Sequence, residues 1–215
     1  MAIGSLTNFS VPLQGGGTSQ PNQGLLMPKL KFRFRLTFIN FGDPAAGQDT
    51  VELTKQVQDV KRPSLNFNPI TIDVYNSKIY LQGKPEWGEI TITLRDDAGG
   101  YVTSLIGAQI QSQFDFEEQA SAASGIDYKF QLLLEVLDGG NGGAGPTTLE
   151  SWQLYGCFIS QVDYGDLNYA TNEQATIQLT VRYDNAEQLP QGSQTNPGGV
   201  GFYNLINSPG GVSAN

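Results

Sequence analysis

The stretch Ile70–Arg95 reads ITIDVYNSKIYLQGKPEWGEITITLR and decides which kind of fold the chain can adopt. In its first five residues, apolar side chains alternate with polar ones, a period of two that is typical of a half-buried strand. A second alternating run covers 78–82, and a third, with its apolar residues inward, covers 89–95. The stretch therefore predicts a long β-hairpin, a connection GKPEWG and a third strand.

A two-residue turn at Asn76-Ser77 gives this hairpin a self-consistent register, because it places all the apolar side chains on one face. Asn tolerates the left-handed conformation that such a turn needs. The cross-strand pairs expected from this turn are Val74–Ile79, Ile72–Leu81, Asp73–Tyr80 and Tyr75–Lys78.

Composition excludes several classes of protein. The 215 residues suit one β-rich domain with extensions, or at most two small domains. Histidine is absent, which removes His-based acid–base chemistry, catalytic triads and His-ligated metals. The single Cys157 cannot form an internal disulfide, and we expect neither a signal peptide nor a membrane span.

Charge is unevenly distributed along the chain. The net charge is −9, but residues 1–95 carry ten basic and seven acidic residues, whereas 96–215 carry two and fourteen. An acidic chain is a poor general binder of nucleic acid. One interpretation is simply a soluble acidic protein. The other is a subunit whose positive and negative halves meet in head-to-tail contacts.

The rest of the chain divides into a 1–28 extension, a β-barrel domain at 29–186 and a Gly-rich tail at 187–215. Four positive charges between Lys29 and Arg35 form either a basic stripe for phosphate or an acidic partner, or gatekeepers against edge aggregation. We expect further strands at 29–41, 51–60, 128–137, 150–162 and 175–183, and one helix at 101–114. The fold class is mainly β: an antiparallel barrel or sandwich with one capping α-helix and a long hairpin that extends the sheet between subunits.

Candidate chemical groups are few. Glu117-Glu118 lies on a flexible loop, where paired carboxylates need not converge. Asp163 and Asp166 fall short of a calcium loop in spacing and acid count. Cys157 has no basic neighbour that would activate its thiol. We therefore expect no catalytic residue, metal site or cofactor, although a two-carboxylate hydrolase stays formally open.

The order of the motifs resembles a known family. DVKRPS comes first, then the hairpin and helix entry IYLQGKPEWGEITITLRDD, then WQLYGCFISQVDYGDLNYA and ATIQLTVRYDNAE. This order, over residues 30–186, resembles the tail tube proteins of contractile-tailed bacteriophages and of related injection systems.

The resemblance implies a structural subunit of a virion tail, assembled in the host cytoplasm. Similar proteins form hexameric rings that stack head-to-tail into a hollow tube inside a sheath. The implied partners are further copies of the chain, the tail sheath, tape measure, baseplate and tail terminator. Viral DNA would pass through the lumen without specific binding, and no membrane is involved.

The hairpin then becomes an assembly element, since it can extend the sheet into a neighbouring subunit. Alternatives are a tube-terminating or baseplate-proximal tube-like protein, or a carbohydrate-binding β-sandwich that uses Trp87 or Trp152 as a platform. The expected inter-subunit residues are Ile70, Ile72, Asp73, Val74, Tyr75, Lys78, Ile79, Tyr80, Leu81 and Trp87.

Overall fold

The computed structural model describes residues 29–42, 50–138, 146, 148–170 and 172–189. The N-terminal extension, most of the glycine-rich loop after Asp138 and the C-terminal tail from residue 190 lie outside the described residues. Residues 29–33 belong to a separate unit from the body of the fold. They form a turn in which the Arg33 N–H donates to the Leu30 carbonyl at 3.3 Å, so the strand predicted from Lys29 begins only at Phe34.

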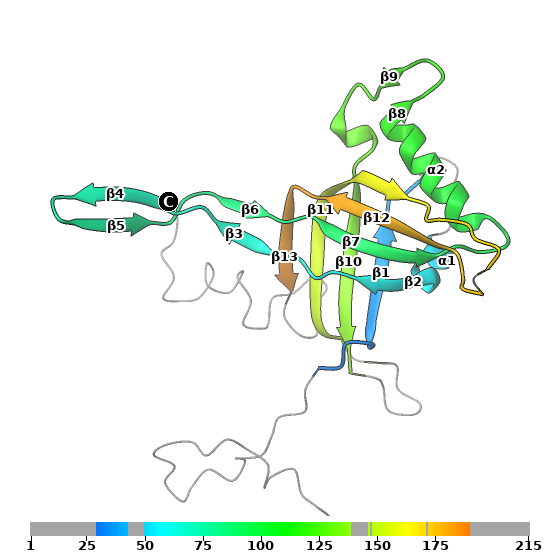
Figure 1. Cartoon of the computed structure of the whole chain (residues 1–215), viewed down its shortest axis with the longest axis horizontal. Helices are drawn as coiled ribbons and strands as arrows, with labels where there is room; N and C mark the ends of the chain where they lie inside the picture. The colour runs from blue at the N-terminus through cyan, green and yellow to red at the C-terminus, as the bar shows by residue number, and fades with distance from the viewer. Residues whose placement is uncertain (1–28, 43–49, 139–145, 147, 171, 190–215) are drawn as a thin grey trace, which may run out of the picture. The chain divides into compact units, whose positions relative to one another are not determined.

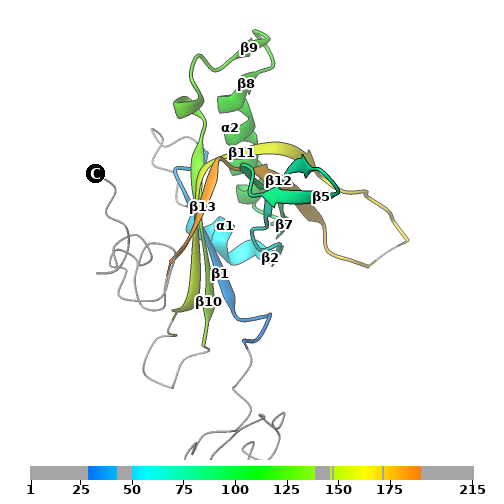
Figure 2. The ribbon, with the colours of Figure 1, turned by 90° about the vertical axis from the view of Figure 1, so that its left-hand side faces the viewer.

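Seven strands of the described residues form one antiparallel sheet, in the order β1-β10-β11-β12-β7-β2, with β13 added onto β11. Figures 1 and 2 show that the strands of one half of this sheet run across those of the other, with β11 belonging to both halves. The mainly β, antiparallel fold predicted from the alternating pattern is confirmed. The strands are β1 (Phe34–Ile39), β2 (Val57–Val60), β7 (Ile90–Arg95), β10 (Phe130–Leu137), β11 (Thr148–Asp163), β12 (Thr176–Arg182) and β13 (Asn185–Leu189).

The long strand β11 joins the two halves because its two ends pair with different neighbours. Residues 148–157 pair with β10, residues 151–155 pair with β13, and residues 158–163 pair with β12. Gly156 lies between these pairings with a φ of +65°, the left-handed region. A Cβ there would collide with the Asp184 carboxylate.

The inward side chains of both halves build one core. Ile90, Ile92 and Leu94 of β7 are at most 2% exposed, as the alternation in the third strand predicts. The helix α2 (Tyr101–Gln113) covers this core with Val102, Leu105 and Ile106. The predicted helix is therefore confirmed.

Two glutamines of α2 bind the helix to the backbone of other segments, Gln109 to two loops and Gln113 to β11. The Gln109 carboxamide accepts from the Gly42 N–H at 2.9 Å and donates to the Tyr128 carbonyl at 2.7 Å. The Gln113 carboxamide accepts from the Ile159 N–H at 2.9 Å and donates to the carbonyl of the same residue at 3.1 Å. These bonds join the helix to the backbone of other segments, so the helix is fixed in position as well as packed.

The prediction of a strand at 51–60 is wrong for its first six residues, which form the helix α1 (Val51–Gln56). The last four residues form the strand β2. Leu53 is fully buried, and Lys55 binds Glu52 one turn earlier at 2.6 Å. The helix contacts β1, β7 and α2. It thus packs beside the edge strand β1.

The strand β13 was not predicted, since the last expected strand ended at residue 183 and a Gly-rich tail was expected from residue 187 onward. It pairs with the first half of β11, from Tyr155–Asn185 to Ser151–Leu189, and buries Ala186. The sequence NAEQL has only one small apolar residue pointing inward, so its alternation is too weak to identify a strand.

We predict that Gly156→Ala destabilises the protein by about 1–3 kcal/mol, because it forces an L-residue into the left-handed region and displaces Asp184. The control is Gly107→Ala in α2, where a Cβ meets open space. That variant should gain about 0.5–1 kcal/mol of helix propensity. Urea denaturation measures both, and equal effects would contradict the role assigned to Gly156.

A second prediction concerns Asp97, whose carboxylate accepts from the Tyr101 and Val102 N–H groups at the first turn of α2. The bond from Val102, more than any other, holds the pKa of Asp97 below its ordinary 3.8. Its stabilisation is therefore complete above the unfolded pKa and is lost as the pH falls through the lower folded pKa. Asp97→Ala should lower Tm at pH 7, and the difference from the wild type should narrow below about pH 4. Glu118→Ala should change Tm little at either pH.

Candidate assembly site

The candidate site is the hairpin arm, defined here as residues 64–88. It contains two short ladders in line, which Figure 1 shows beyond the end of the main sheet. Within the described residues, each of these strands pairs only with its partner in the arm. The ladders are β3 (Leu65–Phe67) with β6 (Pro85–Trp87), and β4 (Ile70–Val74) with β5 (Ser77–Leu81).

The outer hairpin forms as predicted, but its register differs by two residues. The turn is Tyr75-Asn76 rather than Asn76-Ser77, so Val74 lies opposite Ser77. Tyr75 adopts the left-handed conformation, with a φ of +45°. The expected pairs are therefore wrong, and the observed ones are Ile72–Ile79, Ile70–Leu81, Asp73–Lys78 and Thr71–Tyr80.

The apolar side chains nevertheless share one face, because a shift of two residues preserves the side-chain period. Unlike the inward residues of β7, this face is open to solvent. All ten residues of β4 and β5 are exposed. The apolar ones are Ile70 (54% exposed), Ile72 (43%), Val74 (43%), Ile79 (49%) and Leu81 (49%).

The opposite face and the tip carry polar and aromatic groups. Asp73 and Lys78 form an exposed ion pair at 3.7 Å, worth little by itself in water. Tyr80 is 66% exposed, and Tyr75 at the tip is fully exposed. The structure thus brings together nine of the ten predicted assembly residues on one ribbon, while their contacts with another subunit stay a prediction.

A bulge joins the two ladders of the arm. Two residues, 68 and 69, separate β3 from β4, whereas three, 82–84, separate β5 from β6. Gly83 lies in the longer segment, and a Cβ there would collide with the Asn68 carbonyl. The arm can take this course only because glycine allows the two backbones to approach so closely.

The tenth predicted residue, Trp87, lies at the base of the arm and contacts its own chain. Its ring packs against Tyr183 at 5.8 Å, and its indole N–H donates to the Asn185 carboxamide at 3.1 Å. Burial raises the pKa of Tyr183 to about 12. Trp87 therefore anchors the arm to β12 and β13, and an inter-subunit contact of Trp87 stays a prediction.

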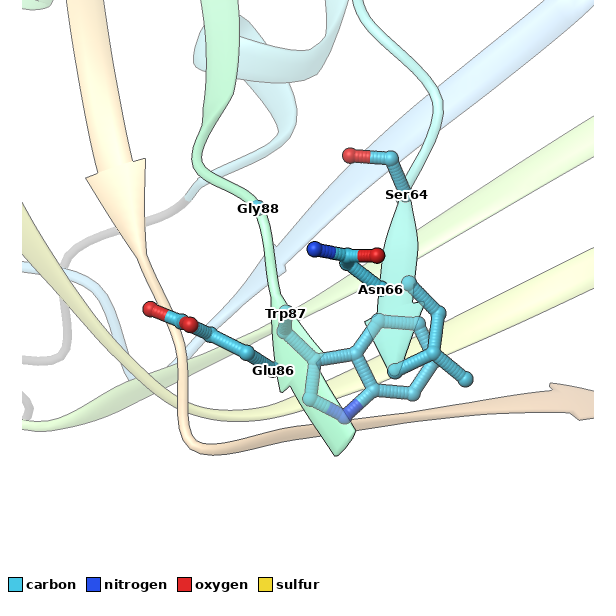
Figure 3. A pocket seen from close by; sticks show the side chains of 6 residues that line it. Ser64, Asn66, Glu86, Trp87 and Gly88 are labelled. Atoms are coloured by element: carbon cyan, nitrogen blue, oxygen red, sulfur yellow. The ribbon is translucent and has the colours of Figure 1, made fainter. Parts of the chain in front are cut away.

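A shallow pocket of about 250 Å³ lies beside this anchor, between β3 and β6 (Figure 3). It is lined by Ser64, Leu65, Asn66, Glu86, Trp87 and Gly88. Glu86 is the one titratable side chain among these lining residues, so they supply no acid–base pair. Trp152, the other indole considered as a sugar platform, is partly buried and donates to Glu150 at 2.6 Å.

The other candidate groups do not converge on a site. The backbone N–H groups of Glu117 and Glu118 bind Asp115, and both residues are exposed between the short strands β8 (Phe114–Asp115) and β9 (Ala120–Ser121). Cys157 is buried, which raises the pKa of its thiol to about 12. Within the described residues, no group of three or more acidic or cysteine side chains could hold a metal ion.

No helix in the described part of the chain is long and apolar enough to cross a membrane. The short 3-10 helix η3 (Gly125–Asp127) follows β9 along the chain.

Comparisons with known proteins were informative only at the level of structure. No protein-family model and no curated protein matches the chain by sequence. The solved cap of the anti-feeding prophage, described as a tube-terminating cap, has a TM-score of 0.56 at 15% identity, over 78% of this chain and 94% of that chain. The PVC sheath/tube terminator of an extracellular contractile injection system has 0.56 at 14% identity, over 77% and 99%.

A third likeness is to the PVC sheath-tube complex in its extended state, with a TM-score of 0.54 at 14% identity, over 76% of this chain and 92% of that one. At these identities the likeness concerns the fold. The chain has the fold found in the tube and terminator structures of contractile injection systems, which confirms the resemblance inferred from the order of the motifs.

We predict that Tyr75→Gly does not destabilise the subunit, because glycine adopts a positive φ without the cost of about 1–2 kcal/mol that tyrosine bears. If the exposed ring at the tip contacts another subunit, the same variant weakens assembly. Tyr75→Asn, which also tolerates this conformation, should behave alike. Urea denaturation and sedimentation velocity provide the two readouts. Lower stability, or unchanged assembly, would contradict the role of the tip.

Proposed function

We propose that this protein is a structural subunit that polymerises as stacked hexameric rings into the hollow inner tube of a contractile tail. The subunit would assemble with further copies of itself and be enclosed by a sheath. The lumen would serve as a conduit, and in a phage tail DNA would pass through it. The subunit would need neither catalysis nor a cofactor. Baseplate, terminator and tape measure proteins would complete the tail of the virion, assembled in the host cytoplasm.

The observation that carries the proposal is the solvent-exposed apolar face of the arm. A two-stranded hairpin is marginally stable in water, and an apolar face of five residues needs a partner surface. None of these five side chains belongs to the buried core of the body, so this face is surplus to the folding of the monomer. A neighbouring copy with the same fold is the simplest surface that could cover it.

The backbone of the arm is also suited to strand addition. A two-residue turn makes Val74–Ser77 a hydrogen-bonded pair, and such pairs alternate along the ladder. The N–H groups of Asp73 and Lys78 then point away from each other, toward the free edges of the hairpin. Each edge can accept a strand of a neighbouring subunit, and assembly would cover edges that otherwise template aggregation.

Charge supports stacking and transport. The net +3 of residues 1–95 and −12 of 96–215 would attract when the two halves meet in successive rings. An acidic lumen would repel DNA phosphates, so that a passing strand does not adhere.

The runner-up is a tube terminator, because the cap and terminator structures match as well as the sheath-tube complex. A terminator would form a single ring and stop, whereas a tube subunit would elongate with concentration.

Electron microscopy of the purified protein at rising concentration tests the proposal. Rings that lengthen into tubes support the tube subunit, and rings of fixed height support the terminator. A monodisperse monomer at all concentrations would contradict both.

The arm is tested by the double variant Ile72→Ser/Ile79→Ser, whose two side chains face each other across the hairpin. We expect tubes to disappear while the urea midpoint of the body changes by less than the measurement error, because neither residue contributes to the core. The matched control is Ile126→Ser, an isoleucine 84% exposed outside the arm. Normal tubes in the double variant would refute the role of the arm.

A further inference from the structure

A second exposed apolar surface lies in the connection between β11 and β12. We call the described residues 164–170 the β11–β12 loop. Its sequence YGDLNYA carries three large side chains that the body of the fold does not cover. Leu167 is 91% exposed, Tyr169 is fully exposed and Tyr164 is 49% exposed.

Side-chain hydrogen bonds give this loop a defined shape. The Gly165 N–H donates to the Asp163 carboxylate at 2.9 Å, and the Ala170 N–H donates to the Asn168 carboxamide at 2.9 Å. Gly165 has a φ of +69°. These turns hold the backbone in a shape that directs the apolar side chains outward. Exposure of these side chains to water is unfavourable unless another surface covers them.

The arm and the β11–β12 loop lie at opposite ends of one ladder. In the pairing of β7 with β12, Ile90 lies opposite Val181, and Arg95 lies opposite Thr176. The arm enters β7 just before Ile90, and the loop leads into β12 at Thr176. The two surfaces are therefore separated by the length of the ladder, about 17 Å at 3.4 Å per residue. Figure 1 shows the arm and this loop on opposite sides of the sheet.

The two surfaces also complement each other in charge. Residues 163–175 carry Asp163, Asp166 and Glu173 and no basic residue. The outer part of the arm, 70–84, carries Lys78 and Lys84 against Asp73, and the second carboxylate of the arm, Glu86, lies at its base. All of these groups are exposed. Opposite charges around apolar centres favour one docking orientation and disfavour like-with-like pairing.

We propose that the β11–β12 loop is the docking surface that receives the arm of a neighbouring copy of this chain. Leu167, Tyr164 and Tyr169 cover part of the arm's apolar face, and the lysines of the arm lie near Asp166 and Glu173. Unlike surfaces at opposite ends of the subunit make a heterologous contact, which propagates in one direction and closes only if the rotation between copies allows it. The inference rests on the proposed polymerisation and names the contact that drives it.

Cross-linking between two distinguishable copies tests this contact. One copy carries Asn76→Cys, at the exposed turn of the arm, and a second, with a different affinity tag, carries Leu167→Cys. The native Cys157 is buried and does not compete for a maleimide reagent. A short bismaleimide should link the two copies when they are mixed and assembled. A copy with Ile126→Cys in place of Leu167→Cys serves as the control and should link at least about tenfold less.

Charge exchange provides the second test. Lys78→Glu and Asp166→Lys should each raise the concentration at which tubes form by about tenfold, equivalent to about 1.4 kcal/mol. Both changes in one chain should restore most of the loss. Lys78→Gln controls for the loss of the ion pair with Asp73 and should have the smaller effect.

The outcomes separate this inference from the proposed function. If the wild-type chain never forms rings or tubes, the proposed function fails and the inference fails with it. If tubes form but the arm links to Ile126→Cys as efficiently as to Leu167→Cys, or the double reversal does not restore assembly, only the docking surface is refuted. If Asp166→Lys leaves tube formation unchanged but weakens the binding of a sheath protein to the tube, the docking surface is refuted and the loop is assigned to another partner.

Discussion

The fold depends on one strand, β11, that belongs to both halves of the sheet. Its first half is hydrogen bonded to β10 and β13, and its second half to β12. The chain can change neighbours only if its backbone turns sharply between these halves, and Gly156 provides that turn with a positive φ. Leu154, Cys157 and Ile159, on either side of it, are all buried, so the turn also brings the two halves onto one core. The close approach of Asp184 leaves no space for a side chain at Gly156.

Alternation in the sequence does not distinguish a core strand from an assembly strand. Ile90 and Ile92 in β7 are at most 2% exposed, whereas Ile70 and Ile72 in β4 are 54% and 43% exposed. Both strands alternate equally well, because each is apolar on one face only. A fully buried aliphatic side chain contributes about 1.5–3 kcal/mol relative to an exposed one. In β7 that free energy stabilises the monomer, and in the arm most of it is available only on association. The burial of this face is therefore separable from the folding of the body, as the proposed assembly requires.

Much of the fold could be predicted from side-chain periodicity, and the errors arose where the period was short or ambiguous. The predicted hairpin register was wrong because asparagine adopts the left-handed conformation more readily than tyrosine, so the turn was placed at Asn76-Ser77 rather than at Tyr75-Asn76. The error of two residues nevertheless preserved the apolar face. The helix 51–56 was missed because six residues cover less than two turns and fit either period. The site was predicted as a ribbon of residues, but its exposure could not be, since exposure depends on whether another part of the same chain reaches it. The β11–β12 loop lacks periodicity altogether, and only its exposed side chains identify it.

An exposed apolar hairpin is also an aggregation hazard, and the arm contains features that limit which surfaces it can bind. Asp73 and Lys78 place one charged side chain on each strand of the hairpin, and an unrelated strand that covers them would remove their hydration without replacing it. The bulge at Gly83 interrupts the ribbon, so a long flat strand cannot align along the whole arm. A second arm presents the same two lysines together with Asp73 and Glu86, so it complements these lysines less well than an acidic surface does. A partner must therefore offer apolar side chains, carboxylates and a short docking length together, which is a stricter requirement than hydrophobicity alone.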